Sequence, residues 1–186
     1  LFFSVRHTYK ITAFAAGASS MWLQMICFWA FQIYAGQIYK WFGLLIAVFM
    51  LGSLSGMLYA KYGHKINTLN KTFFRSEILY LLWIILCFIF VQFQKLNWAY
   101  ILIFLAGTGF LTGLQFLHIS KAYAIIKEKG NQMKIYSADS FGGCFASGLG
   151  GAFLIPVWGI EKSLLFILFF KFLIFAWWGH KNRYGL

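Results

Sequence analysis

Acidic residues are scarce in this chain. Of its 186 residues only four are aspartate or glutamate, and charged residues of either sign make up 11%. About a quarter of the residues in a soluble globular domain are charged, so this chain lacks the polar groups to cover a surface exposed to water. Hydrophobic residues make up 61% of it, and its mean hydropathy is +0.74. The composition therefore excludes an ordinary soluble domain and indicates a protein solvated by the lipid bilayer.

Motifs for catalysis and metal binding are also lacking. The three cysteines, Cys27, Cys87 and Cys144, lie inside apolar runs and lack the CxxC or CxxCH spacing of zinc and covalent haem sites. We interpret them as small apolar helix residues. The sequence has no HExxH, GxSxG or Walker motif, no paired-carboxylate site, and only a G-x-G match at 107–113 that no strand precedes. We therefore expect no enzyme activity, no metal and no cofactor.

Long apolar runs occupy most of the chain. A helix needs roughly 20 mostly apolar residues to cross a bilayer. Six runs approach this length, at 11–34, 41–59, 78–93, 98–119, 138–158 and 163–178. Because a backbone in lipid must satisfy its own hydrogen bonds, these runs predict helices. The sequence thus predicts an all-α, six-transmembrane-helix bundle that forms a single domain over 1–186. Since the first residue is Leu1 rather than Met, we expect an incomplete N-terminus.

The basic residues predict the orientation of this bundle. The formal net charge is +12, but the basic residues lie in short segments between the runs, which disfavours nucleic-acid binding. Twelve fall on one side of the predicted bundle: Arg6, Lys10, Lys61, Lys65, Lys71, Arg75, Lys121, Lys127, Lys129, Lys134, Lys181 and Arg183. Three fall on the other side, namely Lys40, Lys95 and Lys162. The positive-inside rule makes the first side cytoplasmic, together with both termini. We expect a multi-pass protein of a bacterial cytoplasmic membrane.

Small residues recur at every fourth position in two of the runs. There are three such stripes: Gly52 with Gly56, Gly143 with Ser147 and Gly151, and Gly142 with Ala146 and Gly150. This spacing places small residues on one helix face, where a neighbouring backbone can approach closely. The stripes therefore predict sites of helix packing. The single proline, Pro156, predicts a kink or an end of the fifth helix.

Several short motifs together carry a family resemblance. The first run ends in FQ, the second begins a turn with FMLG, and the fourth contains GLQF. The stretch 135–160 contains Y-x-A-D-x-x-G-G followed by L-I-P-x-x-G-I. Together they resemble the integral-membrane region of spermidine-synthase-like (polyamine aminopropyltransferase-like) membrane proteins. In that family a separate soluble domain performs aminopropyl transfer, and this chain lacks that domain's Gly-rich nucleotide loop.

A broader resemblance comes from the sequence GMLYAKYGHK at 56–65. It resembles the G-x-L-x-D-R-x-G-R-K loop of the major facilitator superfamily, and six spans would equal one half of such a transporter. Ala60 stands where that loop has an acidic residue. Gln24 stands where the resemblance leads us to expect a glutamate, and Leu117, followed by His118, where it leads us to expect proline. The missing carboxylate disfavours proton-coupled transport.

Two charged residues fall at membrane depth. Asp139 begins the fifth run, where a carboxylate interacts well with the helix dipole and caps free amides. We interpret it as a helix-start carboxylate that pairs with a nearby lysine, with a gate or binding group as the alternative. Lys171 lies within the sixth run, where a positive charge in lipid is energetically costly and must be compensated. Three reasons remain open: snorkelling to the cytoplasmic edge, pairing with Asp139, or contact with a lipid phosphate or a partner subunit.

Uncharged polar residues complete the set of candidates. His118 is the only histidine deep in a run, whereas a haem with two histidine ligands needs a second one on a facing helix. We therefore interpret His118 as a packed residue that is hydrogen-bonded near Gln115. Gln24, Gln32 and Gln115 are predicted to hydrogen-bond between helices and to stabilise the bundle.

These features predict a non-catalytic accessory or anchoring subunit that packs against lipid and against other membrane-protein subunits. The alternative is half of a transporter for a polyamine-like or other organic cation, in which Asp139 supplies the only negative charge at membrane depth. A third hypothesis is a subunit of a membrane electron-transfer complex, next to a quinone or to haem carried by a partner.

Overall fold

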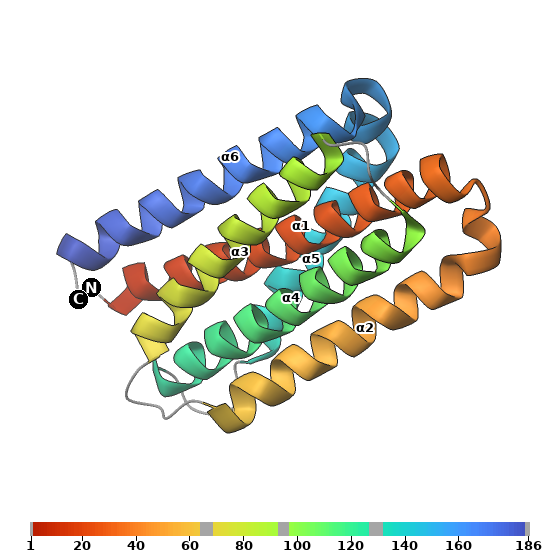
Figure 1. The fold of residues 1–186 in the computed structure, drawn as a ribbon. Coiled ribbons are helices and arrows are strands. Elements are labelled where there is room, and N and C mark those ends of the chain that lie inside the picture. The colour runs from red at the N-terminus through yellow and green to blue at the C-terminus, as the bar shows by residue number, and fades with distance from the viewer. Residues whose placement is uncertain (1, 64–68, 93–96, 127–131, 185–186) are drawn as a thin grey trace.

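The structure is a bundle of long helices. This computed structural model describes residues 2–63, 69–92, 97–126 and 132–184. Its elements pack lengthwise (Figure 1): α1 (Phe2–Ala35), α2 (Ile38–Gly63), α3 (Leu69–Gln92), α4 (Trp98–Ile126), α5 (Met133–Ala146), the π-helix η3 (Ser147–Leu154) and α6 (Ile155–Tyr184). These four ranges contain no strand. The all-α prediction is thus confirmed.

Five helical runs of the described residues are long and apolar enough to cross a membrane. They are Thr8–Ala35, Ile38–Tyr62, Phe73–Gln92, Trp98–Ala124 and Met133–Gly179. The multi-pass membrane class that the composition predicts agrees with this finding. The count differs from six because the predicted runs 138–158 and 163–178 fall into a single helical run. The reason is that α5, η3 and α6 follow one another without an intervening loop.

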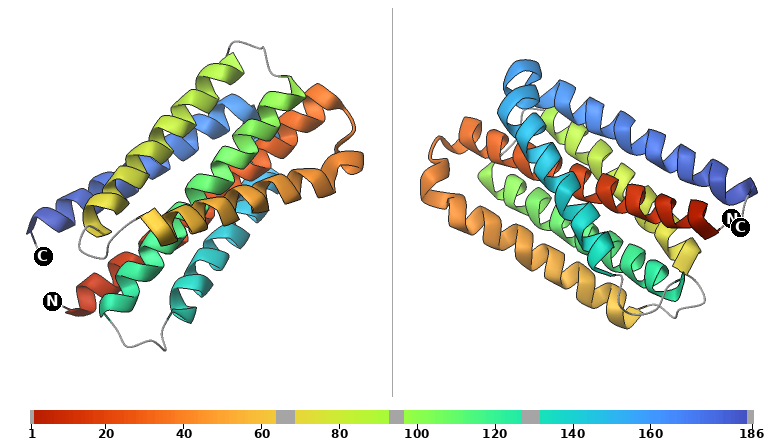
Figure 2. Two further views of the ribbon diagram at one scale, coloured as in Figure 1. Left: turned by 60° about the horizontal axis from the view of Figure 1, so that its bottom comes forward. Right: turned by 180° about the vertical axis from the view of Figure 1, so that it is seen from behind.

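The long last run nevertheless changes direction at Gly159. This glycine has φ 78° and ψ 172°, a backbone conformation outside the helical region that glycine adopts at little cost. Beyond it, α6 returns along the bundle, so that α6 ends at the same end of the molecule at which α1 begins (Figures 1 and 2). Pro156, predicted to kink or end the fifth helix, is the second residue of α6, after η3 and three residues before the non-helical Gly159. Since proline has no backbone N–H to donate, a change of hydrogen-bond pattern before it is expected.

The helices extend beyond the predicted runs. α3 begins at Leu69 rather than at 78, and α5 begins at Met133 rather than at 138. Apolar runs mark only the part of a helix that matches the lipid, whereas backbone hydrogen bonding continues through polar residues. The difference matters because it places Glu77 inside α3 and Asp139 inside α5.

Two central helices, α1 and α4, organise the packing. Of the most apolar window of α1, 78% is buried, against 17% for α2. α1 contacts α5 and α6, α4 contacts α2 and α3, and contacts also join α1 with α4 and α3 with α6. Among the α-helices this set of contacts is unchanged when α1, α2 and α3 are exchanged with α4, α5 and α6, whereas the contacts of η3 with α1, α5 and α6 have no counterpart. The α-helices of the first half therefore contact those of the second half in a two-fold pattern.

Glycines make the two closest helix pairs possible. In the pair α2–α4, a Cβ atom added to Gly52 would overlap the carbonyl oxygen of Ala106, and one added to Gly56 would overlap that of Phe110. From the other side, Gly113 lies in the same way against the carbonyl of Ser53. Backbones this close allow Cα–H···O contacts and dense packing, which lipid cannot replace. The packing role predicted for Gly52 and Gly56 agrees with this geometry.

Glycines also allow the backbones of α1 and α5 to approach closely. Gly142 lies against the carbonyl oxygen of Phe14, and Gly17 lies against the carbonyl oxygen of Asp139. Gly143 and Gly151 instead face the flexible side chains of Met21 and Met25. The closest contact is therefore made by the stripe that contains Gly142, while Gly143 and Gly151 pack more loosely. Ser147, the third member of the stripe that contains Gly143 and Gly151, lines a cavity.

A glycine-to-alanine pair on α2 tests this packing. Gly56→Ala places a methyl group on the Phe110 carbonyl, and overpacking of this kind costs about 1–3 kcal/mol. We expect a clearly lower apparent melting temperature in detergent. Gly43→Ala on the same helix is the control, because a Cβ there meets nothing within 4 Å and alanine favours helix by up to about 1 kcal/mol. Equal melting temperatures for the two variants would contradict the close crossing.

Candidate functional site

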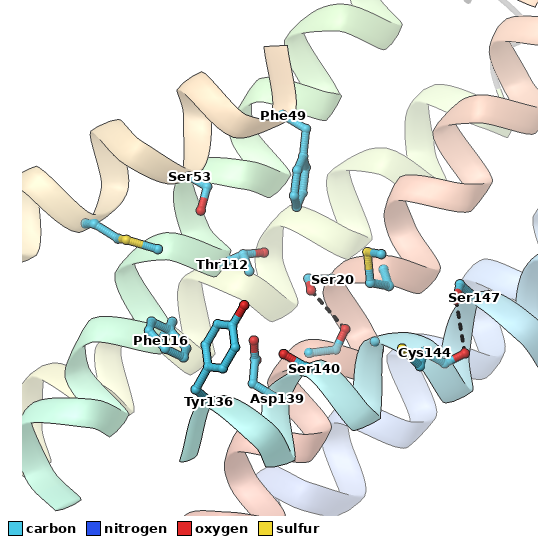
Figure 3. A pocket seen from close by; sticks show the side chains of 14 residues that line it. Ser20, Phe49, Ser53, Thr112, Phe116, Tyr136, Asp139, Ser140, Cys144 and Ser147 are labelled. Carbon is cyan, nitrogen blue, oxygen red and sulfur yellow. Dashed lines mark hydrogen bonds between the residues drawn. The ribbon is translucent and has the colours of Figure 1, made fainter. Parts of the chain in front are cut away.

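The bundle contains a half-open cavity between the two glycine-packed pairs. Its volume is about 390 Å³, and α1, α2, α4 and α5 line it. Asp139 and Tyr136 project from α5 toward Thr112 on α4 and Ser53 on α2 (Figure 3). Ligand pockets in proteins have volumes of roughly 300–1,000 Å³. We call this space the Asp139 cavity; its walls carry hydroxyl, carboxylate, thioether and aromatic groups.

Three of the six hydroxyl groups that line the Asp139 cavity present acceptors. Ser20 donates its hydroxyl proton to the carbonyl of Gly17 at 2.9 Å, and Ser147 donates to Cys144 at 3.0 Å. Thr112 Oγ1 donates to the carbonyl of Thr108 at 2.8 Å. Each of these three hydroxyls thus donates its one proton to a backbone carbonyl three or four residues earlier and keeps lone pairs for another donor. A group that donates hydrogen bonds or carries positive charge fits such walls.

Asp139 is the carboxylate of this cavity. It lies inside α5, and the first turn of that helix contains no acidic residue. The N-cap of α5 is Gln132, whose side chain makes no capping hydrogen bond. The helix-start role predicted for Asp139 is therefore wrong, because α5 begins earlier than its apolar run. Asp139 Oδ1 is buried and accepts no hydrogen bond from the described residues.

Lys171 belongs to a separate, fully buried network. Its Nζ lies 3.1 Å from Glu77 Oε2 and 3.2 Å from Gln115 Oε1, and it stands 4.5 Å from the centre of the Tyr80 ring. The Lys171 and Glu77 side chains are 1% and 3% exposed. Gln115 also donates from Nε2 to the carbonyl of Ser76 at 3.5 Å. Residues of α3, α4 and α6 thus surround one ammonium group.

This network corrects two interpretations of Lys171. The side chain does not snorkel, because it is buried, and its ion-pair partner is Glu77 rather than Asp139. The apolar run that starts at 78 places Glu77 at a span edge, whereas α3 starts at Leu69 and carries Glu77 into the bundle. The signal available in the sequence was the cost of a lysine in lipid, which demands an acidic partner from a set of only four.

The remaining candidates are buried polar residues outside the Asp139 cavity. His118 and Gln24 are 1% and 6% exposed. Gln115 bonds between helices as predicted, while Gln32 accepts the backbone N–H of Ile38 at 3.1 Å and so closes the turn before α2. His7, His64 and His180 have no described side chain. No group of three or more potential metal ligands occurs among the residues that the structure describes.

The cysteines do not form a cluster of special chemistry. Cys27 and Cys87 are buried in the apolar core, and Cys144 is exposed on a wall of the Asp139 cavity. All three are free thiols, as the spacing predicts.

No family model, curated protein or solved structure matches this chain. Its function must therefore be argued from the cavity and the buried charges themselves.

Removing one member of the buried ion pair should strongly destabilise the fold. Lys171→Met leaves Glu77 buried without a partner, which costs about 3–5 kcal/mol. Restoring neutrality with Glu77→Gln in the same chain should recover much of the lost stability. The measurement is thermal unfolding of the purified variants in one detergent.

Lys162→Met is the matched control, since Lys162 lies on the same helix but is exposed. We expect it to unfold like the unaltered chain. If Lys171→Met were as stable as Lys162→Met, the buried pair would not be the structural element described.

Proposed function

We propose that this chain is a membrane domain that binds a small organic cation in the Asp139 cavity and moves it through the bilayer. The observation that carries the proposal is that Asp139 is the one carboxylate among the described residues that line this cavity of ligand size, while its Oδ1 is buried beside Gly17 and accepts no hydrogen bond from the described residues. A buried carboxylate oxygen without a donor is costly. An ammonium group bound in the cavity supplies the charge that compensates the carboxylate.

The composition of the cavity walls supports a cation rather than an anion. Neither lysine nor arginine is among the lining residues. The hydroxyl protons of Ser20, Thr112 and Ser147 are donated to backbone carbonyls, so these side chains offer oxygen lone pairs. Phe49 and Phe116 add ring faces, which attract cations.

The helix arrangement supports movement. The Asp139 cavity lies between the pairs α1–α5 and α2–α4, each held together by glycines. The repeated contact pattern relates α1, α2 and α3 to α4, α5 and α6. Many transporters are built from internal repeats with the substrate at the repeat interface. We propose that the run Met133–Gly179 crosses the membrane twice, turning at Gly159, so that six spans form a half like that of a major-facilitator transporter.

Three further features belong to this proposal. Both termini are cytoplasmic, in agreement with the distribution of basic residues. The membrane is a bacterial cytoplasmic membrane, and the chain is the membrane region of a spermidine-synthase-like protein without catalytic activity of its own.

A second candidate function rests on the outer surface. Large apolar side chains are exposed along α2 and α5, among them Tyr39, Leu54 and Phe141. Lipid alone suits such a surface, but so does another membrane subunit. An accessory or anchoring subunit would therefore co-purify in fixed stoichiometry with a partner, whereas a carrier functions without one. The structure adds no observation in favour of the electron-transfer hypothesis.

Uptake into liposomes tests the proposed function. The probes are butylammonium, 1,4-diaminobutane and spermidine, which are protonated at neutral pH and carry N–H donors. We expect uptake of at least one probe above that of protein-free liposomes, driven by an inside-negative potential. Asp139→Asn should reduce that uptake by about tenfold or more, because a hydrogen bond to a charged group contributes about 1.5–3 kcal/mol.

Glu161→Gln serves as the control, since it also removes one carboxylate but at an exposed position outside the cavity. It should transport like the unaltered chain. Uptake that is absent for every probe, or that is equal in the two variants, would refute the carrier function.

A further inference from the structure

The number of negative charges at the Asp139 cavity limits the charge of its ligand. The chain has four acidic residues. Glu77 is already paired with Lys171, and Glu161 is exposed and does not line the cavity. Glu128 lies outside the described residues. Asp139 is thus the one carboxylate among the residues that line the Asp139 cavity.

We infer that the Asp139 cavity is a site for a monovalent ammonium ligand with a compact apolar body, and that it discriminates against polyamines. This inference rests on the proposed function and specifies its substrate class. One ammonium group meets the Asp139 carboxylate. The rest of the molecule packs against the side chains that make up the other walls.

Those other walls suit an apolar body. Met21 and Met57 supply flexible thioether side chains that adapt to ligand shape. Phe49, Phe116 and Tyr136 supply rings from three different helices. None of these five groups carries a negative charge, and the serine and threonine hydroxyls offer only dipoles.

A second positive charge has no compensating group in this cavity. Moving a charged group out of water without an opposite charge is strongly unfavourable in a medium of low dielectric constant. A ligand with two or three positive charges must therefore keep its other ammonium groups in water, or it does not bind in the cavity.

A matched pair of ligands isolates the effect of the second charge. Butylammonium and 1,4-diaminobutane share a four-carbon chain and differ by one terminal ammonium group. Their dissociation constants, and that of spermidine, are measured by calorimetry on the purified full chain in detergent. We expect butylammonium to bind at least tenfold more tightly than either polyamine, and Asp139→Asn to weaken its binding at least tenfold. Glu161→Gln should leave it unchanged.

A gain-of-charge variant makes the test independent of loss of folding. Ser53 on α2 lines the same cavity opposite Asp139 (Figure 3). Ser53→Asp supplies a second carboxylate, so the preference should shift toward 1,4-diaminobutane by about tenfold or more. Thermal unfolding of each variant shows that it is folded.

The outcomes separate the two proposals. If a polyamine binds as tightly as butylammonium and its binding depends on Asp139, the monovalent assignment is overturned while the cation-binding function remains. If no ligand binds in an Asp139-dependent manner, both are overturned. If Ser53→Asp leaves the ratio of the affinities for butylammonium and 1,4-diaminobutane unchanged, the number of carboxylates in the cavity does not determine how many charges its ligand carries, and the inference is overturned.

Discussion

The close backbone crossing at glycines is the interaction on which the rest of this structure depends. In lipid, apolar surface gains little by moving from acyl chains to protein, so helices associate through dense packing and hydrogen bonds. Gly56 and Gly113 bring α2 onto α4, and Gly17 and Gly142 bring α1 and α5 together. Because each pair is held this tightly, the space that remains lies between the pairs. The Asp139 cavity is that space.

The buried charges follow a second constraint, which is that a charge in lipid must find a partner. Lys171 satisfies it with Glu77 and Gln115, and the three residues come from three different helices. Asp139 makes no ion pair like this, and its Oδ1 accepts no hydrogen bond from the described residues. Glu77 thus balances an internal charge, and Asp139 is the carboxylate at which we propose that a ligand binds. A buried pair is weak evidence of net stability, but its partners depend strongly on each other.

The sequence is informative where a one-dimensional pattern reports the environment directly. The length of the apolar runs predicts the helices α1, α2 and α4. Small residues at every fourth position predict the close contacts of Gly52 and Gly56. It is less informative at helix ends, because hydropathy does not mark where backbone hydrogen bonding stops. That error moved Glu77 to a span edge and Asp139 to a helix start. Both residues lie inside helices.

What the sequence by itself determined is the class of the molecule: helices long and apolar enough for a membrane, few charges, and small residues on the faces that pack. The tertiary structure alone decided which charges meet, since Lys171 and Glu77 are far apart in the chain and the sequence pointed to Asp139 as the acidic partner of the lysine. It also decided that Asp139 faces a cavity rather than capping a helix. The physical reason is that hydropathy depends on neighbours along the chain, whereas ion pairs and cavities depend on how separate helices cross, and the glycine contacts fix those crossings.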